Sequence, residues 1–466
     1  MNKFLEAVTN VFRVPDLRNR ILFTLALLAV YRLGAFIPTP GVNTSALMDF
    51  FDQNRGSVFG MFSLFSGGML ERMTIFALGI MPYITASIIL QLLTVVVPTL
   101  EKLSKEGELG RRKITQWTRY LTIILAVIQS FGIAVALQSS QGNFVLNPGM
   151  GFIVMTIITL TTGTAFIMWL GEQISERGIG NGMSLIIFAG IVVGLPSAAY
   201  SVWENVFVTR NWPALQAIII LLAMIAVVAF IVLVERAERR VPVQYAKRVV
   251  GRKVMGGQQT HMPLKVNAGG VIPVIFASSM LALPQTLTTL PWVKSNEWLS
   301  AILASIAHAE PLYVVVFVTA IIFFCFFYVS IIFNPNEAAD NMRKYGGFIP
   351  GIRPGKSTAD YLNKILTRIT VVGGIYLAIL CLIPDIMIAG IKLQHLPLVG
   401  AWIDTNFPRF LLDGLGVQFY FGGTSLLIVV GVAMDFVNQV EAQLIMRHYE
   451  GFTPKAGRVR GRRSVF

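Results

Sequence analysis

The side chains that carry out most enzyme chemistry are few in this sequence, and their spacing assembles no catalytic site. The run GIRPGKS from Gly351 to Ser357 is one residue short of the phosphate-binding pattern G-x-x-x-x-G-K-S, and no apolar strand precedes it. Cys325 and Cys381 lie inside apolar stretches and predict neither a disulfide nor a metal site. The histidines lie in loops or tails, which excludes an intramembrane Ser–His dyad or an HExxH helix: His261, His308, His395 and His448. We therefore expect no enzyme activity, no metal and no cofactor.

Two charged residues are candidates for ion coupling, which is a different kind of chemistry. Arg32 lies within an apolar stretch, and Asp435 lies near the end of the last one, on one helical face with Asn438 and Glu441. Ionisable groups at mid-membrane are costly and mark ion pathways. Anchoring of helix ends explains these positions better, so a secondary transporter of small solutes stays the alternative hypothesis.

The composition indicates that membrane-spanning helices must hold any functional site in this protein. Of 466 residues, 55% are hydrophobic and 13% charged, with a mean hydropathy of +0.67, which predicts a polytopic membrane protein. A helix needs about 20 apolar residues to cross a bilayer. Ten stretches qualify: Ile21–Ile37, Met73–Val97, Tyr120–Leu137, Phe152–Leu170, Asn181–Ala199, Ala214–Val234, Gly270–Leu290, Leu312–Phe333, Ile369–Ile388 and Phe419–Val440. Because backbone groups must be satisfied in lipid, we expect ten transmembrane helices in an all-α fold.

Basic residues predict the orientation of these spans. On the side of the N-terminus lie 31 of the 38 Lys and Arg residues, and only six lie on the other side. The positive-inside rule then places both termini in the cytoplasm. Each half has five spans, so the halves are inverted. The expected segments are an amphipathic segment 1–20, a first half 21–200, a sixth helix with its lead-in 201–234, a basic loop 235–268, the rest of the second half 269–441 with a basic loop 334–368, and a basic tail 442–466.

A repeat links the two halves. GIMPYITASIIL, from Gly79, is echoed by GVIPVIFASSML, from Gly270, with six of the twelve aligned positions identical. Paired hydrophobic segments of this kind, interrupted by proline at corresponding points of inverted halves, indicate a transport path.

Apolar side chains along this path predict a constriction. Ile84 and Ile88 lie one helical turn apart, and the repeat places Ile275 at the position equivalent to Ile84. A ring of aliphatic side chains excludes water and ions by dewetting. Just before the second span, Ser57–Leu70 is apolar, rich in glycine and too short to cross, so it is either a re-entrant cap or a mobile stopper below the ring.

Long motifs in the chain resemble the SecY family of protein-conducting channels. They include FSGGMLERMTIFALGIMPYITASI, GEQISERGIGNGMSL, THMPLKVNAGGVIPVIFASS, GGFIPGIRPGKST and YFGGTSLLIVVGVAMDF. The resemblance runs in order from about Arg18 to Tyr449. It is weakest in the external loop 385–417 and in the tail after Glu450.

The resemblance implies roles for particular residues. The implied pore ring is Ile84, Ile88, Met183, Ile187, Ile275 and Ile428, with methionine at position 183 where isoleucine is usual. The implied plug is the short segment 57–70, a half-helix that includes Phe59, Gly60, Phe62, Leu64, Phe65, Gly67 and Gly68. The implied lateral gate, between spans two and three and spans seven and eight, carries Ser87, Gln129, Ser278 and Ser279. Ordinary helix packing explains each of these residues taken singly better, whereas as a set they could hold the gate closed by weak interhelical hydrogen bonds.

The resemblance also implies partners. The implied docking residues for a ribosome or the motor ATPase SecA are Arg248, Arg252, Lys253, Arg353 and Lys356. Ribosomal RNA is a polyanion that basic loops attract. The expected partners are the membrane subunits SecE and SecG, SecA, the ribosome, nascent polypeptides that bear signal sequences, and lipid. The expected location is the bacterial cytoplasmic membrane.

Overall fold

The fold is that of a computed structural model, which describes residues 14–450 with gaps at 54–65, 140–143, 209–213, 246–247, 251–252, 256–258, 288–292, 294–295, 306–309 and 390–422. Each of the ten expected spans overlaps a long described helix. These are α2 (Pro15–Gly34), α5 (Met81–Val96), α7 (Glu108–Ser139), α8 (Met150–Arg177), α9 (Gly182–Trp203), α10 (Ala214–Arg236), α11 (Ile272–Leu287), α14 (Pro311–Ile332), α16 (Lys356–Ala389) and α19 (Gly423–Glu450). A five-residue π-helix, Glu204–Val208, follows α9.

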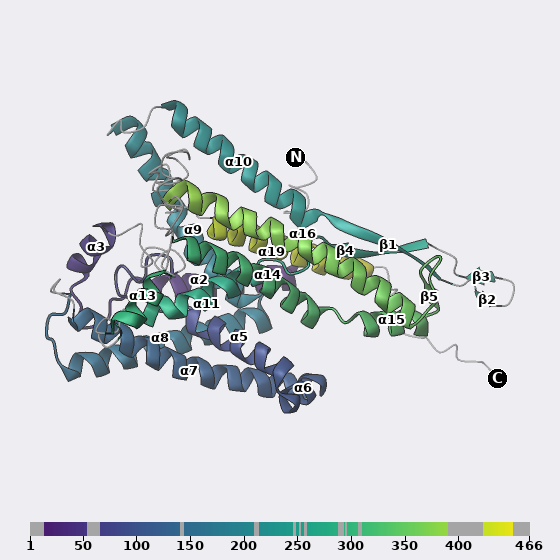
Figure 1. Cartoon of the computed structure of the whole chain (residues 1–466), viewed down its shortest axis with the longest axis horizontal. Helices are drawn as coiled ribbons and strands as arrows, with labels where there is room; N and C mark the ends of the chain where they lie inside the picture. Colours follow the sequence, from purple (N-terminus) through teal and green to yellow (C-terminus); the bar gives the residue numbers. More distant parts are fainter. Residues whose placement is uncertain are drawn as a thin grey trace, which may run out of the picture.

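Shorter elements lie at the two ends of this helix bundle. Figure 1 shows α3 (Thr44–Gln53) and α13 (Glu297–Ser305) toward one end, and α6 (Pro98–Lys105) and α15 (Pro335–Lys344) toward the other. The second end also carries all five strands and the basic loops. We call it the basic end.

By length and composition, five helices within the described residues can cross a membrane. The pair α5 and α6, bent by 100° at Val97, makes a sixth if it counts as one span. The apolar parts of α9 and α11, Gly182–Ser197 and Ile272–Leu281, are shorter than these spans. Pro98 starts α6, and the residue before a proline is biased away from helical conformation, which explains the bend.

The helices repeat one packing pattern in the two halves. In the first half α5 contacts α7, α7 contacts α8, α8 contacts α9, and α2 contacts α9. In the second half α11 contacts α14, α14 contacts α16, α16 contacts α19, and α10 contacts α19 in the same order. The halves meet where α9 lies against α19 and where α11 lies against α5 and α7. The prediction of two five-helix halves is therefore confirmed.

The expected start of the second span at Met73 is wrong, because α5 begins at Met81. Residues 67–80 form turns, and Met73 has a φ of 44°. Their backbone is satisfied by other partners, as when the Ile75 N–H donates to the Ile37 carbonyl oxygen at 3.0 Å. The Phe76 ring lies between Tyr31 of α2 and Phe166 of α8, with centroid distances of 6.0 Å to each. Tertiary packing holds this apolar segment out of the helix.

A small sheet at the basic end was not predicted. Its strand order is β4 (Gln259–Lys265), β1 (Glu238–Tyr245) and β5 (Gly347–Phe348), so it joins the loop 235–268 to the loop 334–368. A separate hairpin pairs β2 (Arg248–Val250) with β3 (Lys253–Met255). Val241 and Leu264 of the sheet pack with Leu362 and Leu366 of α16 in one buried cluster. The two basic loops therefore form one platform.

Candidate functional site

The six residues of the expected pore ring come together at the centre of the bundle. The five isoleucines are between 0% and 7% exposed and belong to one buried cluster, with Met183 packed against it. They come from four helices of both halves: α5, α9, α11 and α19. The structure thus joins side chains separated by up to 344 positions (428 − 84) in one buried hydrophobic cluster.

A cavity of about 630 Å³ opens above this cluster, at the basic end. Four ring residues line it: Ile84, Met183, Ile187 and Ile275. Its other lining residues are mostly polar and include Gln91, Thr115, Arg119, Glu172 and Asn181. These four residues of the expected ring therefore form an apolar floor for this cavity, which we call the vestibule and whose other walls are mostly polar.

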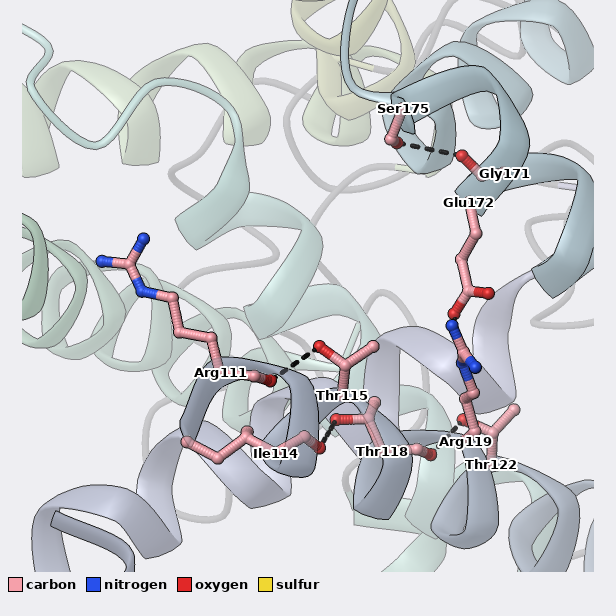
Figure 2. A network of polar contacts seen from close by, with 9 residues as sticks. All are labelled: Arg111, Ile114, Thr115, Thr118, Arg119, Thr122, Gly171, Glu172 and Ser175. Atoms are coloured by element: carbon pink, nitrogen blue, oxygen red, sulfur yellow. Dashed lines mark hydrogen bonds and ion pairs between the residues drawn. The ribbon is translucent and has the colours of Figure 1, made fainter. Parts of the chain in front are cut away.

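An ion pair braces the wall of this vestibule. Figure 2 shows Arg119 of α7 reaching Glu172 of α8, with its Nε 2.8 Å from the glutamate Oε1. On α8 one turn further, Ser175 donates to the Gly171 carbonyl oxygen at 2.9 Å, and its Oγ accepts from the Gly182 N–H at 2.8 Å. Ser175 thus satisfies an otherwise unpaired N–H at the start of α9. These bonds set the angle at which α9 carries Met183 and Ile187 to the ring.

A second cavity, of about 310 Å³, lies on the other side of the ring. Its lining includes Gly190, Ile191 and Ser425, which lie one helical turn from the ring residues Ile187 and Ile428 on the same helices. The apolar cluster therefore lies between two cavities, as expected of an hourglass-shaped pore.

The end of the expected plug lines this second cavity. Gly67 and Gly68 contribute to its wall, with φ angles of 67° and 78°. A Cβ at Gly67 would lie 2.7 Å from the Gly190 carbonyl oxygen, so only glycine fits there. The plug residues Phe59, Gly60, Phe62, Leu64 and Phe65 lie outside the described residues. The described end of the segment is seated under the ring, against α9.

The repeat copies share one local geometry. Gly79 and Gly270 have φ angles of 56° and 59°, and each stands two residues before the first residue of α5 or α11. The aligned Pro82 and Pro273 each occupy the second residue of their helix. The two copies of the sequence repeat therefore have the same backbone conformation at the start of their helices. Both copies lie at the contact between α5 and α11.

The expected gate residues lie at this same seam but bond differently from the expectation. The Ser87 Oγ accepts from Gln91 Nε2 at 3.3 Å, within α5, and the Ser278 Oγ donates to the Ile275 carbonyl oxygen at 3.0 Å, within α11. Ser279 is 1% exposed, and its Oγ has no hydrogen-bond partner in the described part of the chain. Gln129 is half-buried on α7. Within the described residues, Ser87 and Ser278 therefore bond inside their own helices, and apolar side chains make the contact at the seam.

The expected docking residues lie on the platform at the basic end. Arg248 and Lys253 belong to the hairpin of β2 and β3, and Arg252 lies outside the described residues. Arg353 and Lys356 are exposed in the turn before α16 and at its first residue. The Thr358 hydroxyl donates to the Arg353 carbonyl oxygen at 2.9 Å and shapes this turn.

The two ion-coupling candidates do not share a site. Arg32 lines the cavity beyond the ring, where its guanidinium lies 5.0 Å from the Phe36 ring centroid. Asp435 lines a different cavity, of about 180 Å³, at the basic end. Within the described ranges, no three His, Cys, Asp or Glu side chains are grouped to hold a metal ion.

Sequence reasoning missed two polar pairs around the ring. One is Arg119 and Glu172, and the other is Glu235 and Asn267, which join across 32 positions. The one sequence feature that could have indicated these pairs is that their residues lie within a few positions of the ends of apolar stretches.

Comparisons with known proteins agree with this architecture. The SecY family model matches residues 74–437. Protein translocase subunit SecY of Escherichia coli strain K12 is 49% identical over 448 residues, which cover 95% of this chain and 95% of that protein. A solved SecY structure aligns at a TM-score of 0.62 and 19% identity, over 93% of this chain and 94% of that one. In that SecY protein the plug domain stabilises the closed state of the translocation channel and maintains a membrane seal.

A structure of Sec61 in a canine ribosome–channel complex from the endoplasmic reticulum aligns at a TM-score of 0.59 and 16% identity, over 93% of this chain and 94% of that one. At these low identities the two solved structures establish the fold alone. The family model covers more than half of the chain, and the SecY subunit is similar along nearly its whole length. The chain therefore belongs to the SecY family.

Proposed function

We propose that this protein is a gated channel that translocates unfolded polypeptides across the bacterial cytoplasmic membrane and releases membrane segments sideways into lipid. One observation carries the proposal: an apolar ring from both halves separates two cavities, with a glycine-hinged segment seated beneath it. An aliphatic ring excludes ions by dewetting and can close around any side chain because it makes no specific bonds.

The proposed mechanism uses each part of the site. A hydrophobic signal helix enters between α5 and α11, where apolar contact holds the seam. Parting of this seam moves Ile84 and Ile275 apart, because one lies on each helix. The segment that ends at Gly67 leaves the second cavity, and the ring then seals around the moving chain.

The energy for transport comes from a partner in this proposal. The chain would be driven by translation or by SecA hydrolysing ATP, and it would work with SecE and SecG. The platform at the basic end, with exposed Arg353 and Lys356, supports docking of a polyanion such as ribosomal RNA. The solved Sec61 relative is in a complex with a ribosome, which favours the same role here. Docking at this end requires that it face the cytoplasm, with both termini, as the excess of basic residues indicates.

Small-solute transport is disfavoured by the same geometry. Arg32 and Asp435 lie in separate cavities on opposite sides of the ring. An ion-coupled carrier needs its charged groups at one mid-membrane site.

The proposal is tested by changing the ring while leaving the fold in place. Ile275→Asn places a polar side chain in the floor of the vestibule, and it should raise the ion conductance of the resting complex in planar bilayers. The matched control is Ile158→Asn, on α8, whose side chain is 59% exposed and outside the ring. Equal conductance for Ile275→Asn and the unaltered complex would count against a pore at this place.

A further inference from the structure

Asn267 and Glu235 form a hydrogen-bonded pair at the start of α11, which we call the joint. Asn267, which is 4% exposed, lies between the end of β4 and the first residue of α11. Its Nδ2 donates to Glu235 Oε1 at 2.6 Å and to the Gly270 carbonyl oxygen at 3.1 Å. Glu235 belongs to the last turn of α10, so one amide group ties α10 to the turn from which α11 begins.

The same turn is fixed on its other sides by a backbone hydrogen bond and a side-chain contact. The Val266 N–H donates to the Ala237 carbonyl oxygen at 3.0 Å, which continues the pairing of β1 and β4 up to Asn267. The Val271 side chain packs against Gly431 of α19, where a Cβ would overlap it. The joint therefore lies between the sheet at the basic end and the first turn of α11.

The ring residue of α11 lies in that first turn. The Ile275 N–H donates to the Val271 carbonyl oxygen at 3.2 Å, so the placement of Val271 fixes Ile275. Ile275 also lines the 180 Å³ cavity that contains Glu235 and Asn267. The joint and the ring are thus separated by a single helical turn.

We propose that Asn267 and Glu235 are positioning residues that hold α11 in the resting place, with Ile275 in the ring, and that release of their hydrogen bond lets α11 move from α5. This inference rests on the proposed channel function and adds a pair of residues that keep the channel closed at rest. Because β4 leads directly into Asn267, a partner bound to the sheet would act on this joint first.

The experiment measures the resting ion conductance of the complex of the full chain with its membrane subunits in planar bilayers. Asn267→Asp removes both donors and sets a carboxylate against Glu235, and Glu235→Ala removes the acceptor from the other side. Loss of a hydrogen bond to a charged group shifts an equilibrium by roughly tenfold or more, so both variants should raise the conductance by about that factor. Glu235→Gln keeps an acceptor oxygen and should behave as the unaltered protein.

Two further variants separate positioning from general effects. Asn267→Asp combined with Glu235→Gln lets the glutamine amide donate to the aspartate. This restores the link between α10 and the turn before α11 but not the bond to the Gly270 carbonyl oxygen, so the conductance should fall below that of Asn267→Asp alone. Gln439→Glu adds the same charge to the same cavity without touching the joint, and it should leave the conductance low. A merely structural role would reduce the yield of folded complex, not raise its conductance.

The result that would overturn the inference is a low conductance for both Asn267→Asp and Glu235→Ala, or an equal rise for Gln439→Glu. Translocation of a secretory polypeptide by the unaltered complex is measured in parallel in vesicles. Its absence would refute the channel function, whereas its presence with unchanged conductance of the variants would refute only the joint.

Discussion

Two adjacent glycines at the end of the plug segment differ in what surrounds them. Gly67 and Gly68 both have left-handed backbone conformations, which cost any other residue about 1–2 kcal/mol. Only Gly67 approaches the α9 backbone, at Gly190, whereas a Cβ at Gly68 would have only Glu71 Oε2 nearby, 4.0 Å away. Substitutions at these two glycines therefore distinguish the effect of backbone strain from the effect of overlap with α9.

Alanine at these two positions should therefore have unequal effects. Gly67→Ala pushes the segment from its seat under the ring, and we expect it to raise the resting ion conductance several-fold. Gly68→Ala carries the same strain without the overlap and should raise it much less. Single-channel recordings of both variants measure the difference, and an equal effect of the two substitutions would contradict the assigned seat.

The remaining site residues show what a sequence can reveal at this scale. Ile84 and Ile275 could be paired from the repeat alone, because the two copies align there. Ile187 and Ile428 needed the family resemblance, since a lone isoleucine in an apolar helix is ordinary packing. The bonding of Ser87 and Ser278 could not be predicted, because a serine hydroxyl bonds to a side chain or a carbonyl oxygen of its own helix as readily as to a neighbouring helix.

Among the elements, the sheet at the basic end depends on α16. Leu362 is 0% exposed and packs with Val241, Leu264 and Ile349. A Leu→Ala change at such a site costs about 2–5 kcal/mol. Leu366 of α16 packs in the same cluster, so α16 contributes much of the buried contact that keeps the two basic loops together.

We expect Leu362→Ala to loosen the sheet selectively. Hydrogen exchange should show faster exchange in the peptides of β1 and β4, with the membrane helices unchanged. Asn363→Ala, at the exposed neighbouring position, serves as the control and should change nothing measurable. Unchanged protection of β1 in Leu362→Ala would show that α16 does not support the sheet.

The elements also differ in how well they could be predicted from the sequence. The ten apolar stretches predicted helices because length and hydropathy decide membrane spans. The segment 73–80 was assigned to a helix because IFALGI has no polar interruption, whereas in the structure it forms turns that pack between α2 and α8. The strands were missed because β1, ERRVPVQY, has few apolar residues and pairs with a strand that follows after a hairpin.

At the scale of the whole molecule, charge is divided between the two ends. The protein carries a formal net charge of +14, and most of its basic residues lie on one side of the predicted spans. A polyanionic partner bound there releases counterions, which makes its binding sensitive to salt.

We expect Arg353→Ala to weaken ribosome binding and to lower the slope of log affinity against log salt concentration by about 1. Arg72→Ala removes the same charge from the opposite side and is the control, with unchanged affinity and slope. Titrations of the reconstituted complex at several salt concentrations give both quantities. Equal losses for the two variants would mean that net charge, not the platform, attracts the ribosome.

The whole account depends on a polypeptide passing through the ring. The most direct measurement is site-specific crosslinking from photoreactive residues at positions Ile84, Ile275 and Ile428 to a stalled secretory polypeptide in native membranes, with Ile158 of α8 as the lipid-facing control. We predict adducts at all three ring positions and none at Ile158. No adduct at any ring position, with the stalled chain shown to be engaged with the membrane, would contradict the channel and favour transport of small solutes.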